Sequence, residues 1–317
     1  MDTKIKLGIS SCLLGNQVRY DGSGSKDSFL IDTLGHFVSY VPVCPEVECG
    51  LGIPREPVRL VGDPERPSMV TTRTGIDHTE LMLSWAQKRV EELEQENLCG
   101  FIFKKNSPSS GMERVKVYVD EKGMPVRKGV GMFARAFMEH FPLLPVEEDG
   151  RLCDMHLRDN FIERIFALKR WRELLEQGMK RAHIVHFHTA HKLLILSHGT
   201  RYYKEMGNLV AHAKDISLKD LYSQYEMLFL DALKIRATRK KHVNVLQHMM
   251  GYFKKDITAD EKKELLEVIE GYAQEYLPLI VPVTLINHYV RKYDQPYLKG
   301  QVYLNPHPLE LQIRNHV

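Results

Sequence analysis

Three cysteines within the first fifty residues have types and spacing that suit metal binding. Cys12 follows an apolar run, Cys44 follows a second one, and four residues separate Cys44 from Cys49. A four-residue separation occurs within iron–sulfur ligand sets, whose protein ligands are thiolates. Three thiolates with a fourth donor would also suit Zn²⁺, and a free cysteine is often only a small buried side chain. The spacing therefore predicts a thiolate metal site, with an iron–sulfur cluster preferred over zinc.

Side chains able to move protons occur close to these cysteines. Glu46 lies two residues after Cys44, and the loop Asn106-Ser-Pro-Ser-Ser-Gly111 carries three hydroxyl groups. A carboxyl group can accept or deliver a proton, and a serine hydroxyl can both donate and accept a hydrogen bond. We expect Glu46 and the serine loop to supply hydrogen bonds and proton transfer to the same site.

The elements that must position these residues alternate between strand and helix over residues 1–150. Strands are predicted at 4–10, 37–43, 100–103, 115–119 and 143–146, and helices at 81–98 and 130–140. This alternation is typical of βαβ units with a mostly parallel sheet, in which ligands gather at the carboxyl ends of the strands. Cys12, Cys44 and the serine loop each follow a strand, so we expect them at one edge of the sheet.

From residue 154 onward the apolar residues recur at helical spacing. A helix over 259–276 is predicted to begin at Thr258, with Glu261 three residues later in the pattern of a capping box. In this part of the chain, the first strand signal as strong as those of residues 1–150 comes at 301–304. The prediction is an α/β N-terminal domain over residues 1–178, ending near Gly178 where a long helix ends, and an all-α C-terminal domain over 179–317.

Composition places the chain among soluble globular proteins. It has 317 residues, 43% of them hydrophobic and 27% charged, and its longest apolar runs are too short to span a bilayer. No signal-peptide pattern occurs at the N-terminus, so we expect a cytoplasmic protein without a membrane partner. In that compartment five cysteines are seldom disulfides. Cys99 begins a predicted strand and Cys153 a predicted helix, and neither is assigned to the site.

Charge is distributed unevenly between the two parts. Residues 1–150 carry 18 basic and 22 acidic side chains, a net charge of −4, whereas residues 151–317 carry 26 and 19, a net charge of +7. A basic domain can face an anion such as RNA, although solvated helix faces would give the same composition. The candidate RNA-binding residues form one basic run: Arg236, Arg239, Lys240, Lys241 and His242.

Four short motifs in the first part resemble the 2-thiouracil desulfurase (TudS-like) family. They are Ser11-Cys-Leu-Leu-Gly15, Arg19-Tyr-Asp-Gly22, Val43-Cys-Pro-Glu46 and Ser107-Pro-Ser-Ser-Gly111. The second part resembles YbgA-like helical domains through His188–Leu193, Ala237–Asn244 and Pro282–Pro308. The order of the two domains is similar to that of the tRNA 4-thiouridine desulfidases (RudS-like).

This resemblance implies a 4Fe–4S cluster held by three cysteines, with one iron left open to take sulfur from a thiocarbonyl. Cys12 and Cys44 match two of the ligands, and Glu46 and Ser107 match residues that assist proton transfer and substrate placement. The implied reaction is a non-redox desulfuration of thiolated uracil, most specifically 4-thiouridine in tRNA. Water would replace sulfur with oxygen, with Glu46 as general base, and sulfide would be released.

The third ligand departs from the family pattern. In the single-domain desulfurases it is the cysteine of Ser-Pro-Ser-Cys-Gly, and here that position is Ser110. Serine oxygen is a poor iron ligand beside soft thiolates. We therefore predict Cys49 as the third ligand, with Ser110 in the substrate pocket.

Two other functions remain open at this stage. The chain could act on free thiouracil or thionucleosides, or it could be a non-catalytic iron–sulfur sensor or RNA-binding protein. The sequence carries no signal for an oligomeric state.

Overall fold

The computed structural model describes residues 4–119 and 124–316, which divide into two compact units, Met1–Asp154 and Met155–Val317. The division falls before the long helix α4 (Met155–Glu176), not after it near Gly178 as we expected. The reason is that α4 packs against α5 (Arg181–His198) and α7 (Leu218–Lys234) of the second unit. Gly178 does mark the end of α4, with a left-handed φ of 82°.

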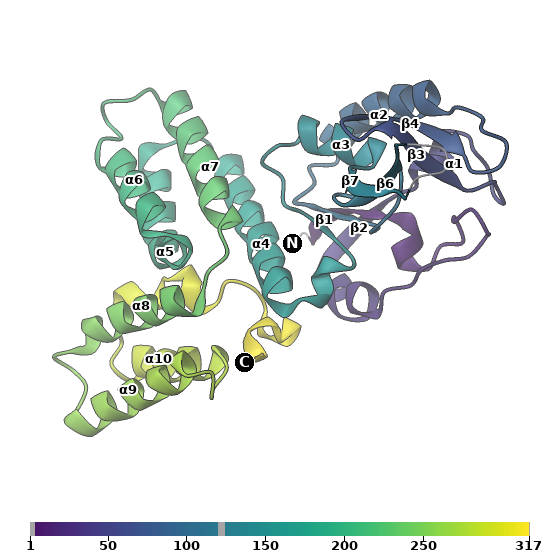
Figure 1. Ribbon diagram of the computed structural model, residues 1–317. Coiled ribbons are helices and arrows are strands. Elements are labelled where there is room, and N and C mark those ends of the chain that lie inside the picture. The colour runs from purple at the N-terminus through teal and green to yellow at the C-terminus, as the bar shows by residue number, and fades with distance from the viewer. Residues whose placement is uncertain (1–3, 120–123, 317) are drawn as a thin grey trace. The chain divides into compact units, whose positions relative to one another are not determined.

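A parallel sheet forms the centre of the first unit, as predicted. Its order is β2-β1-β5-β8, and every pairing in it is parallel. Figure 1 shows β1 beside β2. The strand bounds are β1 Ile5–Ser10, β2 Val38–Val43, β5 Phe101–Phe103 and β8 Val146–Glu148.

Aromatic side chains fill the space between this sheet and two helices, α2 (Thr79–Glu94) and α3 (Met132–His140), which pack against each other. Phe101 of β5 lies 4.7 Å from Phe137 of α3 between ring centroids. Any Cβ at Gly8 of β1 would overlap the Phe101 ring, so this close approach requires glycine. This packing fixes the positions of β1 and β5. Cys12 follows the carboxyl end of β1, and the serine loop follows that of β5.

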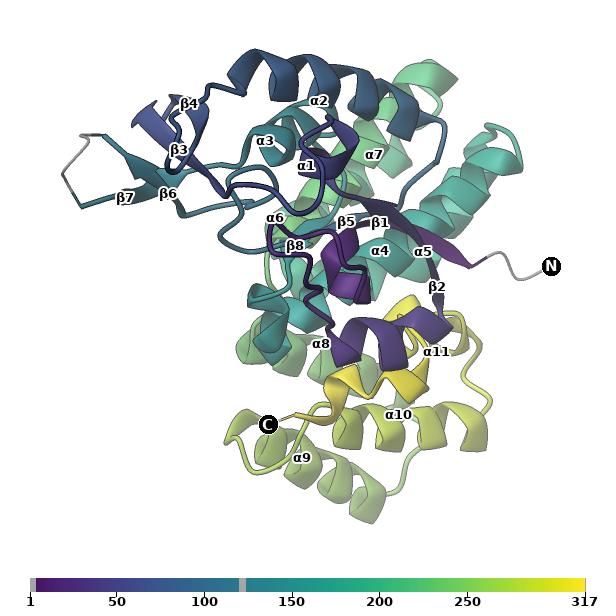
Figure 2. The ribbon, with the colours of Figure 1, turned by 90° about the vertical axis from the view of Figure 1, so that its right-hand side faces the viewer.

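A second, mixed sheet lies in the first unit and was not predicted as a separate layer. Its order is β4-β3-β6-β7, with only the β3–β6 pairing parallel. The predicted strand at 115–119 is β6 of this sheet, not a member of the parallel one. Figure 2 shows these strands together, away from β1. The bounds are β3 Val58–Asp63, β4 Arg66–Thr71, β6 Val115–Tyr118 and β7 Val126–Gly129.

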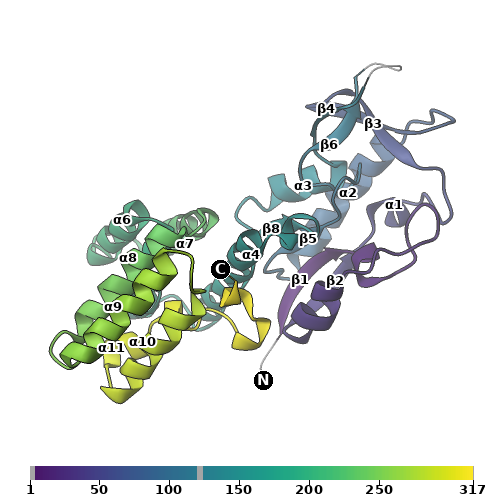
Figure 3. The same ribbon diagram turned by 60° about the horizontal axis from the view of Figure 1, so that its bottom comes forward.

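Helices build the second unit, as predicted (Figure 3). Its core is aromatic: Trp171 of α4 stacks on Tyr225 of α7 at 5.4 Å, and Phe187 of α5 meets the Trp171 ring edge-on at 5.3 Å. The capping box of Thr258 and Glu261 is present at the start of α9. The remaining helices are α6 Thr200–Ala211, α8 Arg239–Met250, α9 Ala259–Ala273, α10 Ile280–Lys292 and α11 Pro296–Lys299.

One detail of this unit differs from expectation. Residues 302–304 form a short 3-10 turn in place of a strand, because the Tyr303 side chain is buried among helices and its hydroxyl meets His242 at 2.9 Å.

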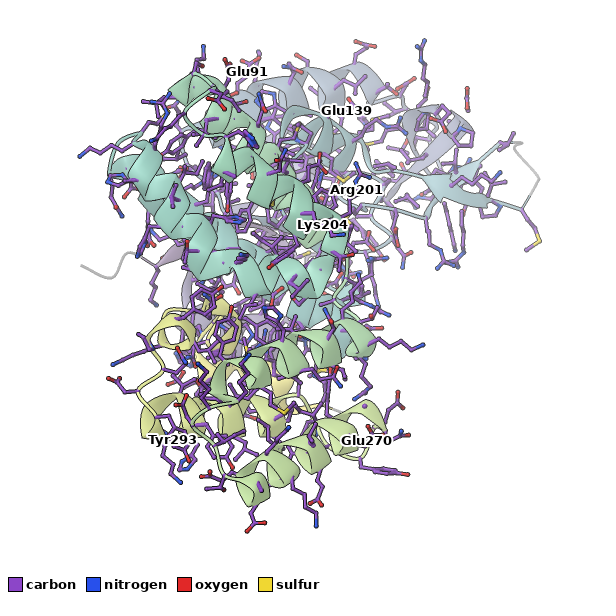
Figure 4. The ribbon with its side chains drawn as sticks, turned by 90° about the vertical axis from the view of Figure 1, so that its left-hand side faces the viewer. Glu91, Glu139, Arg201, Lys204, Glu270 and Tyr293 are labelled. Atoms are coloured by element: carbon purple, nitrogen blue, oxygen red, sulfur yellow. The ribbon has the colours of Figure 1, made fainter. Side chains whose placement is uncertain are left out.

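Figure 4 shows the side chains of this unit, with Arg201 and Lys204 on α6 and Tyr293 just after α10. No helix in the described part of the chain is long and apolar enough to cross a membrane.

Buried histidines should make the second unit sensitive to acid. Burial lowers the pKa of His191 to about 3 and that of His242 to about 3. An unfolded histidine titrates near 6.5, so below that pH the unfolded chain binds the extra protons and stability falls. At pH 5 the loss is about 2 kcal/mol for each of these histidines.

We therefore expect the melting temperature of the helical unit, followed by circular dichroism, to fall between pH 7 and pH 5. His191→Gln should reduce that pH dependence, whereas His288→Gln, at an exposed position, should leave it unchanged. Equal pH dependence in all three proteins would contradict this origin.

Candidate active site

A cavity of about 310 Å³ opens where the strands of the parallel sheet end. Its lining comes from four segments that are far apart in the sequence, as predicted for the carboxyl edge of such a sheet. The 3-10 turn after β1, helix α1 (Pro45–Glu48) after β2, and the loop after β5 all contribute. The chemically active lining residues include Cys12, Cys44, Glu46, Arg55, Lys104, Ser107 and Ser110.

Cys12 and Cys44 are the two cysteines that line this cavity. Cys12 lies in the turn after β1, and Cys44 is the residue that precedes the first turn of α1. Both are buried, and burial is the main reason that the pKa of each thiol is raised, for Cys44 to about 12. Glu46 raises the Cys44 value further. Thiols in this state bind a metal only by releasing their protons, so metal loading should be favoured by higher pH.

Cys49, predicted as the third ligand, does not line the cavity with Cys12 and Cys44. Its thiol lies 3.4 Å from the Glu46 carbonyl oxygen, and its side chain belongs to an apolar cluster with Leu60 and Met69. Residues five apart on a helix point about 140° away from each other, so α1 directs Cys44 and Cys49 to different sides. In the described residues, no group of three or more His, Cys, Asp and Glu side chains is arranged to hold a metal.

Ser110 lines the cavity at the place where the family pattern has a cysteine. Its side chain is almost fully buried, and its hydroxyl lies 3.3 Å from that of Ser109. The cavity therefore offers two thiols, Cys12 and Cys44, together with oxygen donors from Ser110 and Glu46. The two thiols fit two positions of a thiolate iron–sulfur site, and at the third position of the family pattern the cavity wall carries the Ser110 hydroxyl.

The Glu46 carboxylate is the centre of the polar network. Its Oε1 accepts a hydrogen bond of 2.6 Å from the Ser109 hydroxyl and one of 3.4 Å from that of Ser107. Its Oε2 lies 3.8 Å from the Cys44 sulfur and 3.9 Å from an Arg55 nitrogen. Ser109 therefore holds the carboxylate more closely than Ser107 does. A carboxylate fixed in this way can act on a proton beside the thiols.

Helix α3 holds the serine loop in position. The backbone N–H groups of Met132 and Ala134, at its first turn, donate to the carbonyl oxygens of Pro108 and Ser109 at 3.1 and 3.0 Å. These are helix N-terminal groups that have no partner within the helix. A Cβ at Gly131 would lie 2.5 Å from the Ser109 backbone, so the loop can approach α3 only because residue 131 is glycine.

Gly131→Ala should therefore damage the site without touching a reacting group. We expect a loss of about 1–3 kcal/mol in unfolding free energy, from overpacking, and a shift of Ser109 away from Glu46. Gly207→Ala is the control, because a Cβ there meets nothing within 4 Å and lies inside α6. That variant should be neutral or up to about 1 kcal/mol more stable. Urea unfolding of both proteins measures the difference, and equal stability would contradict the packing argument.

Three charged side chains at the site were not predicted. Lys104 follows β5 and pairs with Asp149, which follows β8, at 2.6 Å. Lys104 and Asp149 could have been predicted at the site, because each directly follows a strand of the parallel sheet. Lys104 also lowers the Cys12 pKa, although burial outweighs it. Arg55 donates to the carbonyl oxygens of Val18 and Gly52 at 3.0 Å, a tertiary contact without a sequence signal.

The basic run of the second unit separates into two groups. Arg236, Arg239 and His242 line a second cavity, within that unit. Lys240 is exposed and does not line it. The Lys241 amine donates to the carbonyl oxygens of His198 and Arg236, at 2.7 and 3.1 Å, and so joins α8 to the end of α5.

The fold and the site define the class of this protein. It has a parallel α/β unit, with a cavity lined by thiols and a carboxylate at its strand ends, and then a helical unit. Residues 7–149 match the family model described as 2-thiouracil desulfurase, and residues 192–308 match that of a protein of unknown function, DUF1722. The chain thus belongs to both families, with a desulfurase-family region before a DUF1722 region.

Two relatives and one solved structure are similar to it. The uncharacterized protein YbgA of Escherichia coli is 33% identical over 158 residues, which are 50% of this chain and 94% of YbgA. The uncharacterized protein YbbK of Bacillus subtilis is 35% identical over 108 residues, 32% of this chain and 71% of YbbK. A structure described as the 4Fe-4S-dependent thiouracil desulfidase TudS has 29% identity and a TM-score of 0.40, covering 48% of this chain and 95% of that one.

Proposed function

We propose that this protein removes sulfur from thiolated uracil, and that its substrate is 4-thiouridine in tRNA. The observation that carries the proposal is the cavity in which the Cys12 and Cys44 thiols meet the Glu46 carboxylate. The desulfurase family of residues 7–149 supports the reaction class. A volume of about 310 Å³ is at the small end of ligand pockets and is compatible with a single pyrimidine base.

Cys12 and Cys44 are the residues that would hold an iron–sulfur cluster, with Ser110 at the third position. When bound, an iron that is not saturated by the protein supplies a Lewis acid for the thiocarbonyl sulfur. The two thiols must be deprotonated for this role, and the nearby Lys104 cation favours the Cys12 thiolate.

The chain's own groups account for the proton transfers. Glu46 takes a proton from water as the oxygen attacks the ring carbon, so that a C–O bond forms and the C–S bond breaks. Sulfur leaves as hydrosulfide and no net electron transfer occurs. Ser109 and Ser107 keep the carboxylate oriented, and Arg55 faces its second oxygen.

Turnover of different thiolated substrates tests the proposal. Anaerobically reconstituted full-length protein is mixed with thiolated tRNA, free 4-thiouridine or free 2-thiouracil, and released sulfide is measured. We expect sulfide from all thiolated uracils that enter the cavity, with the highest kcat/KM for tRNA. Activity on the free bases alone would contradict the tRNA substrate, and no sulfide from any of them would contradict desulfuration.

A further inference from the structure

Arg55 lines the active-site cavity and is held there from one side only. Its backbone N–H donates to the carbonyl oxygen of Tyr20 at 2.9 Å. Its side chain is 9% exposed, and its Nη1 donates to the carbonyl oxygens of Val18 and Gly52, each at 3.0 Å. These contacts fix the position of the guanidinium group through its backbone and one of its three nitrogens.

The other guanidinium nitrogens, Nε and Nη2, keep their N–H groups available. Nη2 lies 3.9 Å from Glu46 Oε2, which is too far for a hydrogen bond. No described residue accepts a hydrogen bond from Nε or from Nη2. Leaving the donors of a buried guanidinium without an acceptor is unfavourable, so the cavity favours a ligand that brings an acceptor to this wall.

The other cations of the cavity lining are placed differently. The Lys104 ammonium group pairs with Asp149 Oδ2 at 2.6 Å, so a carboxylate already neutralises it. The Arg19 guanidinium lies over the ring of Tyr20, whose side chain is 42% exposed, and no described residue accepts a hydrogen bond from the Arg19 side chain. Among these cations, Arg55 is therefore the one that combines a fixed position with available donors.

The charges around Arg55 indicate a neutral acceptor. The Glu46 carboxylate stands beside the guanidinium group, and a second anion bound there would face that carboxylate at close range. Like charges repel strongly in a poorly solvated site. A carbonyl oxygen accepts from a guanidinium group without adding a charge, so it suits this position better than a carboxylate or a phosphate does.

Arg55 is also close to the thiols. The Cys44 sulfur lies 3.7 Å from the Val18 carbonyl oxygen, the same oxygen that accepts from Arg55. Apolar side chains provide much of the remaining lining, those of Val18, Val43, Pro57 and Val58. Apolar walls with a few polar groups are typical of small-molecule pockets, in which the polar groups fix the orientation of the ligand.

We propose that Arg55 sets the substrate specificity of the site by binding the second exocyclic oxygen of a thiolated pyrimidine. In 4-thiouracil this is the oxygen on C2. The inference rests on the proposed function, and it narrows the substrate class to pyrimidines that carry both a thiocarbonyl and a carbonyl group. A site built to donate to a ligand oxygen discriminates against the analogue that lacks it, here by about 10- to 100-fold for one charge-assisted hydrogen bond.

Two ligands without sulfur test this contact separately from turnover. Uracil and pyrimidin-4-one, which is the same ring without the oxygen on C2, are titrated by calorimetry into cluster-loaded full-length protein. We expect the wild type to bind uracil about 10- to 100-fold more tightly. Arg55→Met should abolish most of this preference by weakening uracil alone, and Arg55→Lys, which keeps the charge, should retain part of it.

Arg73→Met is the matched control. It removes one cation from the same unit, at a side chain that is 84% exposed and outside the cavity, and it should keep the wild-type preference. Circular dichroism and iron content show whether each variant is folded and loaded. A loss of contacts to Val18 and Gly52 would weaken both ligands equally, so the ratio of the two affinities reports the contact with the oxygen.

Three results would overturn the proposal. They are equal affinity of the wild type for the two ligands, equal weakening of both ligands by Arg55→Met, and a changed cluster absorption in Arg55→Met with an unchanged affinity ratio. The first of these needs no variant. Sulfide release from 4-thiouracil is measured on the same protein. Release without a preference for uracil would overturn only the role of Arg55, whereas the preference without release would overturn only desulfuration.

Discussion

Glu46→Gln should lower the rate of sulfide release from thiolated uracil by about 10²- to 10⁴-fold, the usual contribution of a general base. The amide keeps the size of the side chain and can still accept a hydrogen bond from Ser109, so the cavity should persist. It cannot take a proton from water. Single-turnover sulfide release, normalised to iron content, measures the effect on chemistry separately from cofactor loading.

Glu48→Gln is the matched control for this variant. Glu48 lies on the same short helix but outside the cavity, and its Oε1 accepts from the Cys44 backbone N–H at 2.7 Å, which an amide oxygen can also do. We expect its rate to stay within a few-fold of the wild type. A Glu46→Gln protein as active as Glu48→Gln would remove Glu46 from the mechanism.

Cys44→Ala and Cys49→Ala should differ sharply in iron content after anaerobic reconstitution. Cys44 faces the cavity, so its loss should abolish most iron binding and the visible absorption of the cluster. Cys49 belongs to the apolar cluster, so Cys49→Ala should keep its iron and lose about 1 kcal/mol of stability from the smaller side chain. Loss of iron in Cys49→Ala as well as in Cys44→Ala would support the ligand set predicted from the sequence.

Ser110→Cys completes this series. A third thiolate at the cavity wall should slow the loss of iron in air, because thiolate is a softer and better iron ligand than a serine oxygen. Ser109→Cys is the control one residue away, since Ser109 bonds to Glu46 and does not line the cavity. If both variants lose iron as fast as the wild type, Ser110 does not occupy the third position.

The sequence predicted the parallel sheet and the edge at which the site forms. Buried runs ending at Ser10 and Val43 are strong strand signals, and the rule for parallel sheets then places Cys12 and Cys44 together. The position of Cys49 outside the cavity lining has a simple cause. Spacing along the chain does not give direction, and one turn of helix between Cys44 and Cys49 was enough to turn the second thiol into the apolar cluster.

Other features depend on contacts that no local pattern carries. Strand β4 begins Arg66-Pro67, and a proline weakens a strand signal. Glu163 reads in the sequence as an ordinary charged position of a helix, yet it is buried between His198 and Arg314, the latter 151 residues away along the chain. The basic run was visible, but its division between a cavity and a structural contact of Lys241 was not.

Isotope labelling during a single turnover tests the central claim most directly. Cluster-loaded full-length protein is mixed with thiolated tRNA in ¹⁸O-labelled water, and both sulfide and the oxygen label in the uracil product are measured. The account predicts one sulfide and one labelled oxygen per thiolated base converted, with neither formed by the Cys12→Ala or Cys44→Ala variants. Wild-type protein that carries its cluster yet releases no sulfide from tRNA, 4-thiouridine or 2-thiouracil would contradict it.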